Sequence, residues 1–349
     1  MSEPRTKMPT TMGSETAPAV SNATPKPTVL HTTGYSSFKP GPFSMAWPGF
    51  WGAVVCFAVF SILIEGFFSA DVLSNVLLVS ARLGVVATGV GLLLIQREFD
   101  LSVGAVFTLA GGMTIVGINI GLIPGFTIAA VLTGAGIIGA LNGYLVARLK
   151  LHSLLVTFVT MLACHAAVVG LGQYHQMQLS GYSRSFGLFD FWVLGGIPVS
   201  VIWMVLLVLL AALGLGWTRL GNWIYATGAD PQAAREMGVP VTSVRLQSFA
   251  IASALAALAG VMSSVQTGHM VPKMGDILVF EALLAALVGG VPLRGGRGTV
   301  SGIICGVLIL KMSQQALLTA GGDPVWYRAG VMVALAVIML RFLMRSQEA

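Results

Sequence analysis

The sequence predicts an all-α, polytopic membrane protein with about ten transmembrane helices and with both termini in the cytoplasm. Three observations support this fold class. The 19 basic and 13 acidic residues make up only 9% of the 349 residues, whereas soluble domains carry about 25% charged residues. Hydrophobic residues make up 56% of the chain, and apolar windows of helical length recur from Trp47 onward. This composition excludes a soluble enzyme domain and a receptor with a large head outside the membrane.

The first 46 residues differ from the rest of the chain. They contain seven prolines, many serines and threonines, and no apolar run long enough for the core of a signal peptide. Such a segment cannot bury enough apolar surface to offset the entropy lost on ordering it. We therefore expect a disordered cytoplasmic tail at 1–46 and a transmembrane domain at 47–345.

Apolar windows predict the individual helices. A helix needs about 20 apolar residues to span the hydrocarbon core, and runs of this length without strict alternation are helical. The eighth window is the shortest and is flanked by glycines and Pro292, so we expect a broken or tilted span there. The ten windows are 47–69, 73–95, 101–120, 123–147, 153–171, 197–216, 244–265, 277–293, 300–319 and 325–343.

The positions of lysine and arginine set the predicted orientation. Cytoplasmic loops of membrane proteins carry an excess of these residues. With the N-terminus inside, 14 of the 19 basic residues fall in cytoplasmic segments, which predicts that both termini lie inside. The net charge of +6 is therefore a topology signal, and nucleic-acid binding is not needed to explain it.

Glycines predict where helices pack closely. Small residues let helix backbones approach each other in lipid, and the fourth window supplies Gly134, Gly136, Gly139 and Gly143, of which the last two stand in G-x-x-x-G register. Gly104, Gly111 and Gly112 mark the third window in the same way. Static packing and a bundle whose helices slide against each other both fit this pattern.

No pattern for catalysis or metal binding stands out. The three cysteines are far apart in apolar runs and are interpreted as small core residues. His152 and His165 have no second metal ligand nearby in the sequence. The glycine-rich stretch 289–298 lacks the lysine of a phosphate-binding loop. We therefore expect no cofactor on this chain and no enzymatic activity of its own.

The loop from Thr218 to Val244 is the longest internal cytoplasmic segment, and it predicts a very short helix over 230–238. Asp230 is a favourable N-cap, and Pro231 belongs at the first helical position. Gly238 suits the left-handed position that follows a helix. A helix of about seven residues is not stable alone in water, so it needs a surface to lie against. Docking on a partner protein and packing on the protein's own helix ends are both open.

The turn from Arg97 to Gly104 joins the second and third windows and contains Asp100 and Ser102. Either side chain can accept hydrogen bonds from the free N–H groups at the start of the third helix. The alternative is that the turn reaches toward a pathway through the membrane and offers polar contacts there.

Four ionisable residues lie in or near the windows, namely Glu65, Arg82, Glu281 and Lys311. Charges inside a membrane are costly and usually face a cavity or a partner. Glu65 stands near a helix end, from which its carboxylate reaches the interface. For Arg82, near the middle of its window, an ion pair with Glu281 and a role on a pathway are both open.

Four stretches of the chain, in matching order and spacing, resemble the ribose-type permeases, the membrane subunits of bacterial ATP-binding-cassette (ABC) importers for monosaccharides and related polyols. The similarity covers roughly residues 84–340. The stretches are Asp100-Leu101-Ser102-Val103-Gly104, Gly139 to Gly143 with Thr157 and Thr160, Thr218-Arg219-Leu220-Gly221 through to Gly238, and Gly289-Gly290 with Leu293 and Gly295-Gly296-x-Gly298.

This resemblance implies a permease domain at 47–345 in the bacterial inner membrane, working as one half of a homo- or heterodimer by alternating access. The implied partners are ATPase subunits that bind ATP in the cytoplasm, a solute-binding protein outside, and a sugar. Loop 218–244 would carry the helix that couples to the ATPase, with candidate residues Asp230, Ala234, Arg235, Glu236 and Gly238. Candidate pathway or gating residues are Asp100, Ser102, Asn142, Arg82 and Glu281.

Some residues depart from the family pattern. Val279-Phe280-Glu281 stands where the family commonly has Glu-Leu-Asp, Pro292 and Arg294 replace small residues, and the tail is additional. These departures leave the solute undetermined. The competing interpretation is an ion-coupled secondary transporter for a small polar solute, although no two halves of the chain show matching interrupted helices. A structural or sensory membrane protein is a third class that composition leaves open.

Overall fold

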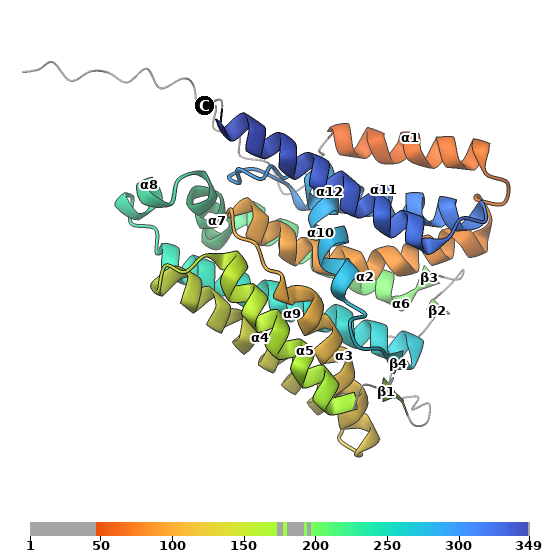
Figure 1. The fold of residues 1–349 in the computed structure, drawn as a ribbon, viewed down its shortest axis with the longest axis horizontal. Helices are drawn as coiled ribbons and strands as arrows, with labels where there is room; N and C mark the ends of the chain where they lie inside the picture. The colour runs from red at the N-terminus through yellow and green to blue at the C-terminus, as the bar shows by residue number, and fades with distance from the viewer. Residues whose placement is uncertain (1–46, 173–176, 180–191, 194–196, 348–349) are drawn as a thin grey trace, which may run out of the picture. The chain divides into compact units, whose positions relative to one another are not determined.

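The computed structural model describes residues 47–172, 177–179, 192–193 and 197–347, so the predicted tail at 1–46 lies outside the described residues. Within these ranges the chain is largely helical (Figure 1). The helices are α1 (Trp47–Leu63), α2 (Ala70–Ile95), α3 (Ser102–Asn119), α4 (Pro124–Arg148), α5 (Ser153–Gly172), α6 (Val199–Trp217), α7 (Arg219–Ala229), α8 (Pro231–Glu236), α9 (Val241–Thr267), α10 (Asp276–Val288), α11 (Val300–Thr319) and α12 (Pro324–Gln347). Four two-residue strands, β1 (Met177–Gln178), β2 (Trp192–Val193), β3 (Ile197–Pro198) and β4 (His269–Met270), form the antiparallel pairs β1–β4 and β2–β3.

Each of the ten apolar windows contains a helix. Eight helices in the described part of the chain are long and apolar enough to cross a membrane: α2 to α6, α9, α11 and α12. The two shorter ones are α1, with 17 residues, and α10, with 13. Helix α10 is the helix of the eighth window, where the flanking glycines and Pro292 predicted an interrupted span. The orientation of the bundle stays a prediction.

Three helices form the centre of the bundle. Buried residues make up 83% of the most apolar window of α2 and 72% of those of α3 and α9. The corresponding share is 22% for α4, α5 and α6 and 17% for α12. These outer helices expose large apolar side chains such as Ile137 and Leu155, for which lipid is the favourable solvent.

The G-x-x-x-G pair of α4 packs directly on the backbone of α9. A Cβ atom at Gly139 would lie 2.3 Å from the Phe249 carbonyl oxygen, and one at Gly143 would lie 2.6 Å from the Leu246 Cα atom. No heavy atom lies within 4 Å of such a Cβ at Gly136, which is on the same helix. The close contact predicted for the G-x-x-x-G pair is therefore confirmed, whereas Gly134 and Gly136, which were counted with them, meet no heavy atom within 4 Å.

Helix α10 starts inside the bundle. The chain leaves α9 through Gly268, which has a φ of +68°, and β4 then pairs with β1. The Gly275 backbone N–H donates to the Thr108 hydroxyl oxygen at 3.0 Å, and Thr108 lies in the second turn of α3. The N-terminus of α10 therefore lies against the first turns of α3, which explains how a 13-residue helix fits among longer ones.

Candidate functional site

The short helix predicted within 230–238 is present as α8. The Asp230 carboxylate accepts hydrogen bonds from the backbone N–H groups of Gln232 at 2.8 Å and Ala233 at 3.1 Å, and Pro231 occupies the first helical position. Gly238 has a φ of +82°, a backbone conformation that a side chain with a Cβ adopts only at a cost. The local sequence thus fixes both ends of this helix.

One face of α8 packs on the protein and the other is free. The Ala234 side chain is fully buried, and α8 packs against α7 and α9. Ala234 therefore fixes α8 to the rest of the chain, and its assignment to the ATPase-coupling loop stays a prediction. Exposed residues are Gln232, Arg235, Glu236 and Met237. An open groove of about 600 Å³ runs beside them, from Arg235 to Leu246.

A glycine junction, formed by Gly228, Gly296 and Gly298 around Ile95, joins this region to the bundle. A Cβ atom at Gly228 of α7 would lie 1.8 Å from the carbonyl oxygen of Ile95, the last residue of α2. The Gly296 N–H donates to the same oxygen at 2.7 Å. The Tyr225 hydroxyl donates to the Gly298 carbonyl at 2.7 Å, and burial raises the pKa of Tyr225 to about 12. The glycine motif at 289–298 therefore packs against α7 and the end of α2.

A second connection ties the start of α9 to the turn between α2 and α3. Arg245 forms a 2.9 Å ion pair with Glu98, and the Gln96 side-chain amide donates to the Ser248 hydroxyl. Burial raises the pKa of the Glu98 carboxyl, and the nearby Arg245 opposes that shift. Because α9 follows α8 after only four residues, the chain connects α8 to these contacts with the turn.

Asp100 caps α3 and begins a buried chain of polar groups. Its Oδ1 atom accepts hydrogen bonds from the Ser102 backbone N–H at 2.8 Å and from the Ser102 hydroxyl at 2.5 Å. Asn142 of α4 donates to the Ser102 hydroxyl oxygen at 3.1 Å, and Thr160 of α5 donates to the Asn142 carbonyl at 2.6 Å. Three predicted residues, Asp100, Ser102 and Asn142, therefore come together. The capping role is confirmed, and the pathway role stays a prediction.

The buried charges of the core pair differently from the expectation. Lys311 of α11 lies 2.7 Å from the Glu281 carboxylate of α10, and both side chains are buried. The same ammonium group lies 5.5 Å from the centre of the Tyr327 ring. Arg82 of α2 donates to the Ser263 hydroxyl at 3.2 Å. The direct ion pair considered for Arg82 and Glu281 is thus replaced by one between Lys311 and Glu281, although both α2 and α11 pack against α10.

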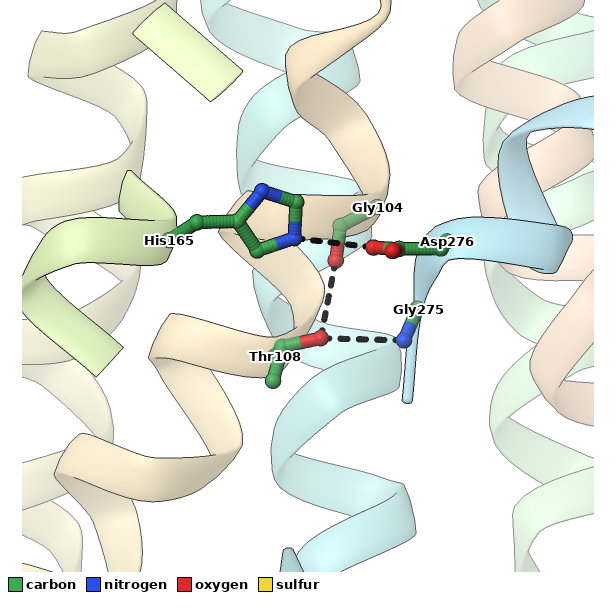
Figure 2. A network of polar contacts seen from close by, with 5 residues as sticks. All are labelled: Gly104, Thr108, His165, Gly275 and Asp276. Carbon is green, nitrogen blue, oxygen red and sulfur yellow. Dashed lines mark hydrogen bonds and ion pairs between the residues drawn. The ribbon is translucent and has the colours of Figure 1, made fainter. Parts of the chain in front are cut away.

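The contact between His165 and Asp276 was not predicted from the sequence. The His165 Nε2 atom of α5 lies 2.8 Å from the Asp276 Oδ1 atom at the start of α10 (Figure 2). Beside this pair, the Thr108 hydroxyl donates to the Gly104 carbonyl at 3.0 Å and accepts from the Gly275 N–H at 3.0 Å. His165 and Asp276 are 111 positions apart in the sequence, so no local spacing predicts their contact.

A metal centre is not indicated by the described residues, in which no group of three or more His, Cys, Asp and Glu side chains is placed to hold an ion. The three cysteines are free thiols, and Cys164 is buried, as expected for a core residue. The described residues therefore provide an exposed helix, α8, that is fixed to a bundle with buried polar clusters.

The bundle of span-length helices defines a multi-pass membrane protein, and comparison with known families defines its class. The chain belongs to the branched-chain amino acid transport system / permease component family, whose model matches residues 72–340. It is therefore a transport permease subunit of the bacterial inner membrane and not itself an enzyme.

Several relatives are import permeases. The ribose import permease of Escherichia coli K12 is 30% identical over 301 residues, which cover 84% of this chain and 92% of the relative. The fructose import permease of Rhizobium meliloti is 30% identical over 296 residues, with coverages of 81% and 82%. The autoinducer 2 import system permease of Yersinia pseudotuberculosis is 30% identical over 281 residues, with coverages of 78% and 76%. A solved metal-chelate type ABC transporter in an inward-facing conformation aligns with a TM-score of 0.49 and 15% identity, covering 84% of this chain and 98% of that one.

Proposed function

We propose that this chain is the membrane subunit of an ATP-driven importer that moves a monosaccharide or related polyol into the cytoplasm by alternating access. The relatives named for ribose and fructose support the solute class. The observation that carries the proposal is α8, whose outer face is exposed while its inner face and both flanks are fixed to the bundle.

In this proposal the chain works with partners. A separate ATPase subunit binds ATP and seats α8 in a surface cleft, and this chain holds no cofactor. A second permease copy or a paralogue completes the membrane part. A solute-binding protein delivers the sugar on the opposite side. The predicted orientation supports this arrangement, because it puts Arg235 and Glu236 of α8 on the cytoplasmic side.

Movement of α8 would reach the bundle by two routes. One runs through α7 and the glycine junction to Ile95 at the end of α2. The other runs through α9 and the Arg245–Glu98 pair to the turn that contains Asp100. Rigid, close-packed contacts of this kind convert a displacement at one site into helix tilt elsewhere. The buried clusters around Asp100 and Glu281 are the candidate gating groups.

The test is reconstitution of the full complex with its ATPase and solute-binding protein in lipid vesicles. We expect ATP hydrolysis that is stimulated by the loaded binding protein and coupled to sugar uptake. A valine at position 238 is strained at positive φ, so Gly238→Val should lose both activities and still insert. Asparagine tolerates this conformation, so Gly238→Asn is the matched control and should retain most of the coupling.

Three results would contradict the proposal. Sugar uptake driven by an ion gradient without any ATPase would favour the secondary transporter instead. Normal coupling in Gly238→Val would remove α8 as the coupling element. ATP hydrolysis by the purified chain alone would contradict the assignment of ATP to a partner.

A further inference from the structure

The His165–Asp276 pair lies near the middle of the bundle. Thr108, which holds the backbone next to Asp276, is eleven residues before the end of α3 at Asn119, and this corresponds to about 16 Å of helix. His165 is twelve residues after the start of α5 at Ser153, or about 18 Å. The hydrocarbon core is about 30 Å thick, so both measures place the pair close to its midplane.

The pair is nevertheless open to the outside of the subunit. The Asp276 side chain is 42% exposed and that of His165 is 18% exposed. An ionisable group at the membrane midplane that faced acyl chains would be costly, and such groups almost always face a cavity filled with water or a polar partner. Acyl chains are therefore unfavourable surroundings for the face formed by α5 and α10 at this level, which leaves water or a polar partner surface.

The position of Asp276 is fixed by backbone contacts between α3 and α10. A Cβ atom at Gly275 would lie 2.1 Å from the Gly104 carbonyl oxygen, so the backbones of α3 and α10 touch directly before Asp276. The Thr108 hydroxyl bridges the same two backbones (Figure 2). Among the described residues, no further hydrogen bond is made by Asp276 Oδ2 or His165 Nδ1. Asp276 Oδ2 and His165 Nδ1 therefore remain available for hydrogen bonds to a solute, and the backbone next to Asp276 is rigidly positioned.

We propose that His165 and Asp276 form a solute-contacting site on an aqueous path along the α5–α10 face, at the middle of the membrane. A carboxylate oxygen accepts a hydroxyl hydrogen, and an imidazole nitrogen donates or accepts one. Side by side, they suit neighbouring hydroxyl groups of a neutral, polyhydroxylated solute. The identity of the solute rests on the proposed function, whereas the water-filled path rests on the exposure of the pair alone.

The experiment measures water access and solute protection with a single cysteine. The three native cysteines are first replaced by alanine in the reconstituted complex. Phe280→Cys is the reporter, because residue 280 lies one helical turn after Asp276 and is half-buried on α10. Ile137→Cys is the control, because it is 63% exposed near the middle of α4, an outer helix. Both are treated with a charged thiosulfonate that does not cross membranes, in the absence of nucleotide and with ATP bound.

We expect modification of Phe280→Cys in at least one nucleotide state and none of Ile137→Cys. The sugar that the wild type takes up best from ribose, fructose and sorbitol should slow the modification. In Asp276→Asn, the sugar concentration that gives half of this protection should rise at least tenfold, with His165→Ala giving a similar rise. A wild-type complex that takes up none of the three sugars would contradict the proposed function, and labelling of Phe280→Cys would still support the aqueous path.

Two results would overturn the inference. The first is no modification of Phe280→Cys in either nucleotide state, which would place lipid or a dry interface against α10. The second is sugar protection that is unchanged in Asp276→Asn and His165→Ala, which would show that the pair does not contact the solute.

Discussion

Asp100 shows how one buried side chain combines a structural benefit with an electrostatic cost. Its carboxylate caps the first N–H groups of α3, yet it lies in a turn where only 5% of the residue is exposed. Burial raises the pKa of Asp100 to about 6, although hydrogen bonds from Ser102 work against this shift. The folded protein therefore binds this proton more tightly than the unfolded chain does, since the usual aspartate pKa is about 3.9.

We predict that this group makes the protein less stable as the pH rises from about 4 to about 6. In that window the folded state still holds this proton while the unfolded chain has released it, so the free energy of unfolding falls with rising pH by at most about 3 kcal/mol in all. Asp100→Asn keeps an acceptor for the cap and should remove the Asp100 part of the slope, leaving the part that comes from the raised pKa of Glu98. Thermal unfolding in detergent between pH 4 and 7 measures it, and Glu98→Gln is the control that should retain the Asp100 contribution. An unchanged slope in Asp100→Asn would contradict the assignment.

The Lys311–Glu281 pair is a second prediction at this scale. Removing one member of a buried ion pair leaves an uncompensated charge, so Lys311→Met should destabilise the protein by about 3–5 kcal/mol. Adding Glu281→Gln should recover part of this loss, because it removes the unpaired carboxylate, while Arg82 loses a nearby negative charge. The measurement is a double-mutant cycle of thermal stability in detergent, combined with uptake. Recovered stability without recovered uptake would assign the pair to the pathway, and additive losses would show that the two groups are not coupled.

At the scale of helices, close approach of backbones organises the bundle. Without a difference in hydrophobicity between lipid and side chains, association depends on packing contacts, and glycine allows them to form at short range. The contact between α4 and α9 shows this clearly, because Gly139 and Gly143 meet the α9 backbone and Gly136 faces open space. The spacing of glycines along a helix therefore predicts a helix–helix contact better than the number of glycines does.

We predict opposite outcomes for two alanine substitutions on α4. Gly139→Ala places a methyl group 2.3 Å from the Phe249 carbonyl oxygen, so it should cost about 1–3 kcal/mol through forced separation of the helices. Gly136→Ala meets no atom within 4 Å and should be neutral or stabilising by up to about 1 kcal/mol, since alanine favours helix. Thermal stability in detergent compares the two, and equal effects would contradict the packing described here.

At the scale of the whole molecule, the glycine junction connects three segments that are far apart in sequence. The end of α2, the end of α7 and the loop between α10 and α11 meet around the Ile95 carbonyl. No side chain separates these backbones. In the proposed function, a displacement of α7 therefore moves the end of α2 directly and is not absorbed by side chains that change rotamer.

We predict that Gly228→Ala disrupts this transmission. Its methyl group would lie 1.8 Å from the Ile95 carbonyl oxygen, so α7 must move away from α2. The reconstituted complex should keep basal ATP hydrolysis and lose at least tenfold in sugar uptake per ATP hydrolysed. Gly214→Ala on α6, where no atom lies within 4 Å, is the control and should behave like the wild type. Normal coupling in Gly228→Ala would show that the junction is only a packing contact.

The sequence alone determined the features that depend on neighbouring residues. Apolar windows located the helices, and the caps at Asp230 and Gly238 located α8, because such signals act within one or two turns. The G-x-x-x-G register also predicted a contact face on α4, and Asp100 was recognised as a cap. Ordered motifs further indicated the permease family, which the family model and the relatives confirm.

Only the tertiary structure decided which distant groups meet. It buried Ala234 and left Arg235 exposed, and it paired Glu281 with Lys311 instead of Arg82. It also brought His165 to Asp276, which the sequence separates by 111 positions. The physical reason is that these contacts follow from how helices pack and where α10 begins, and both depend on backbone approach between segments remote in sequence.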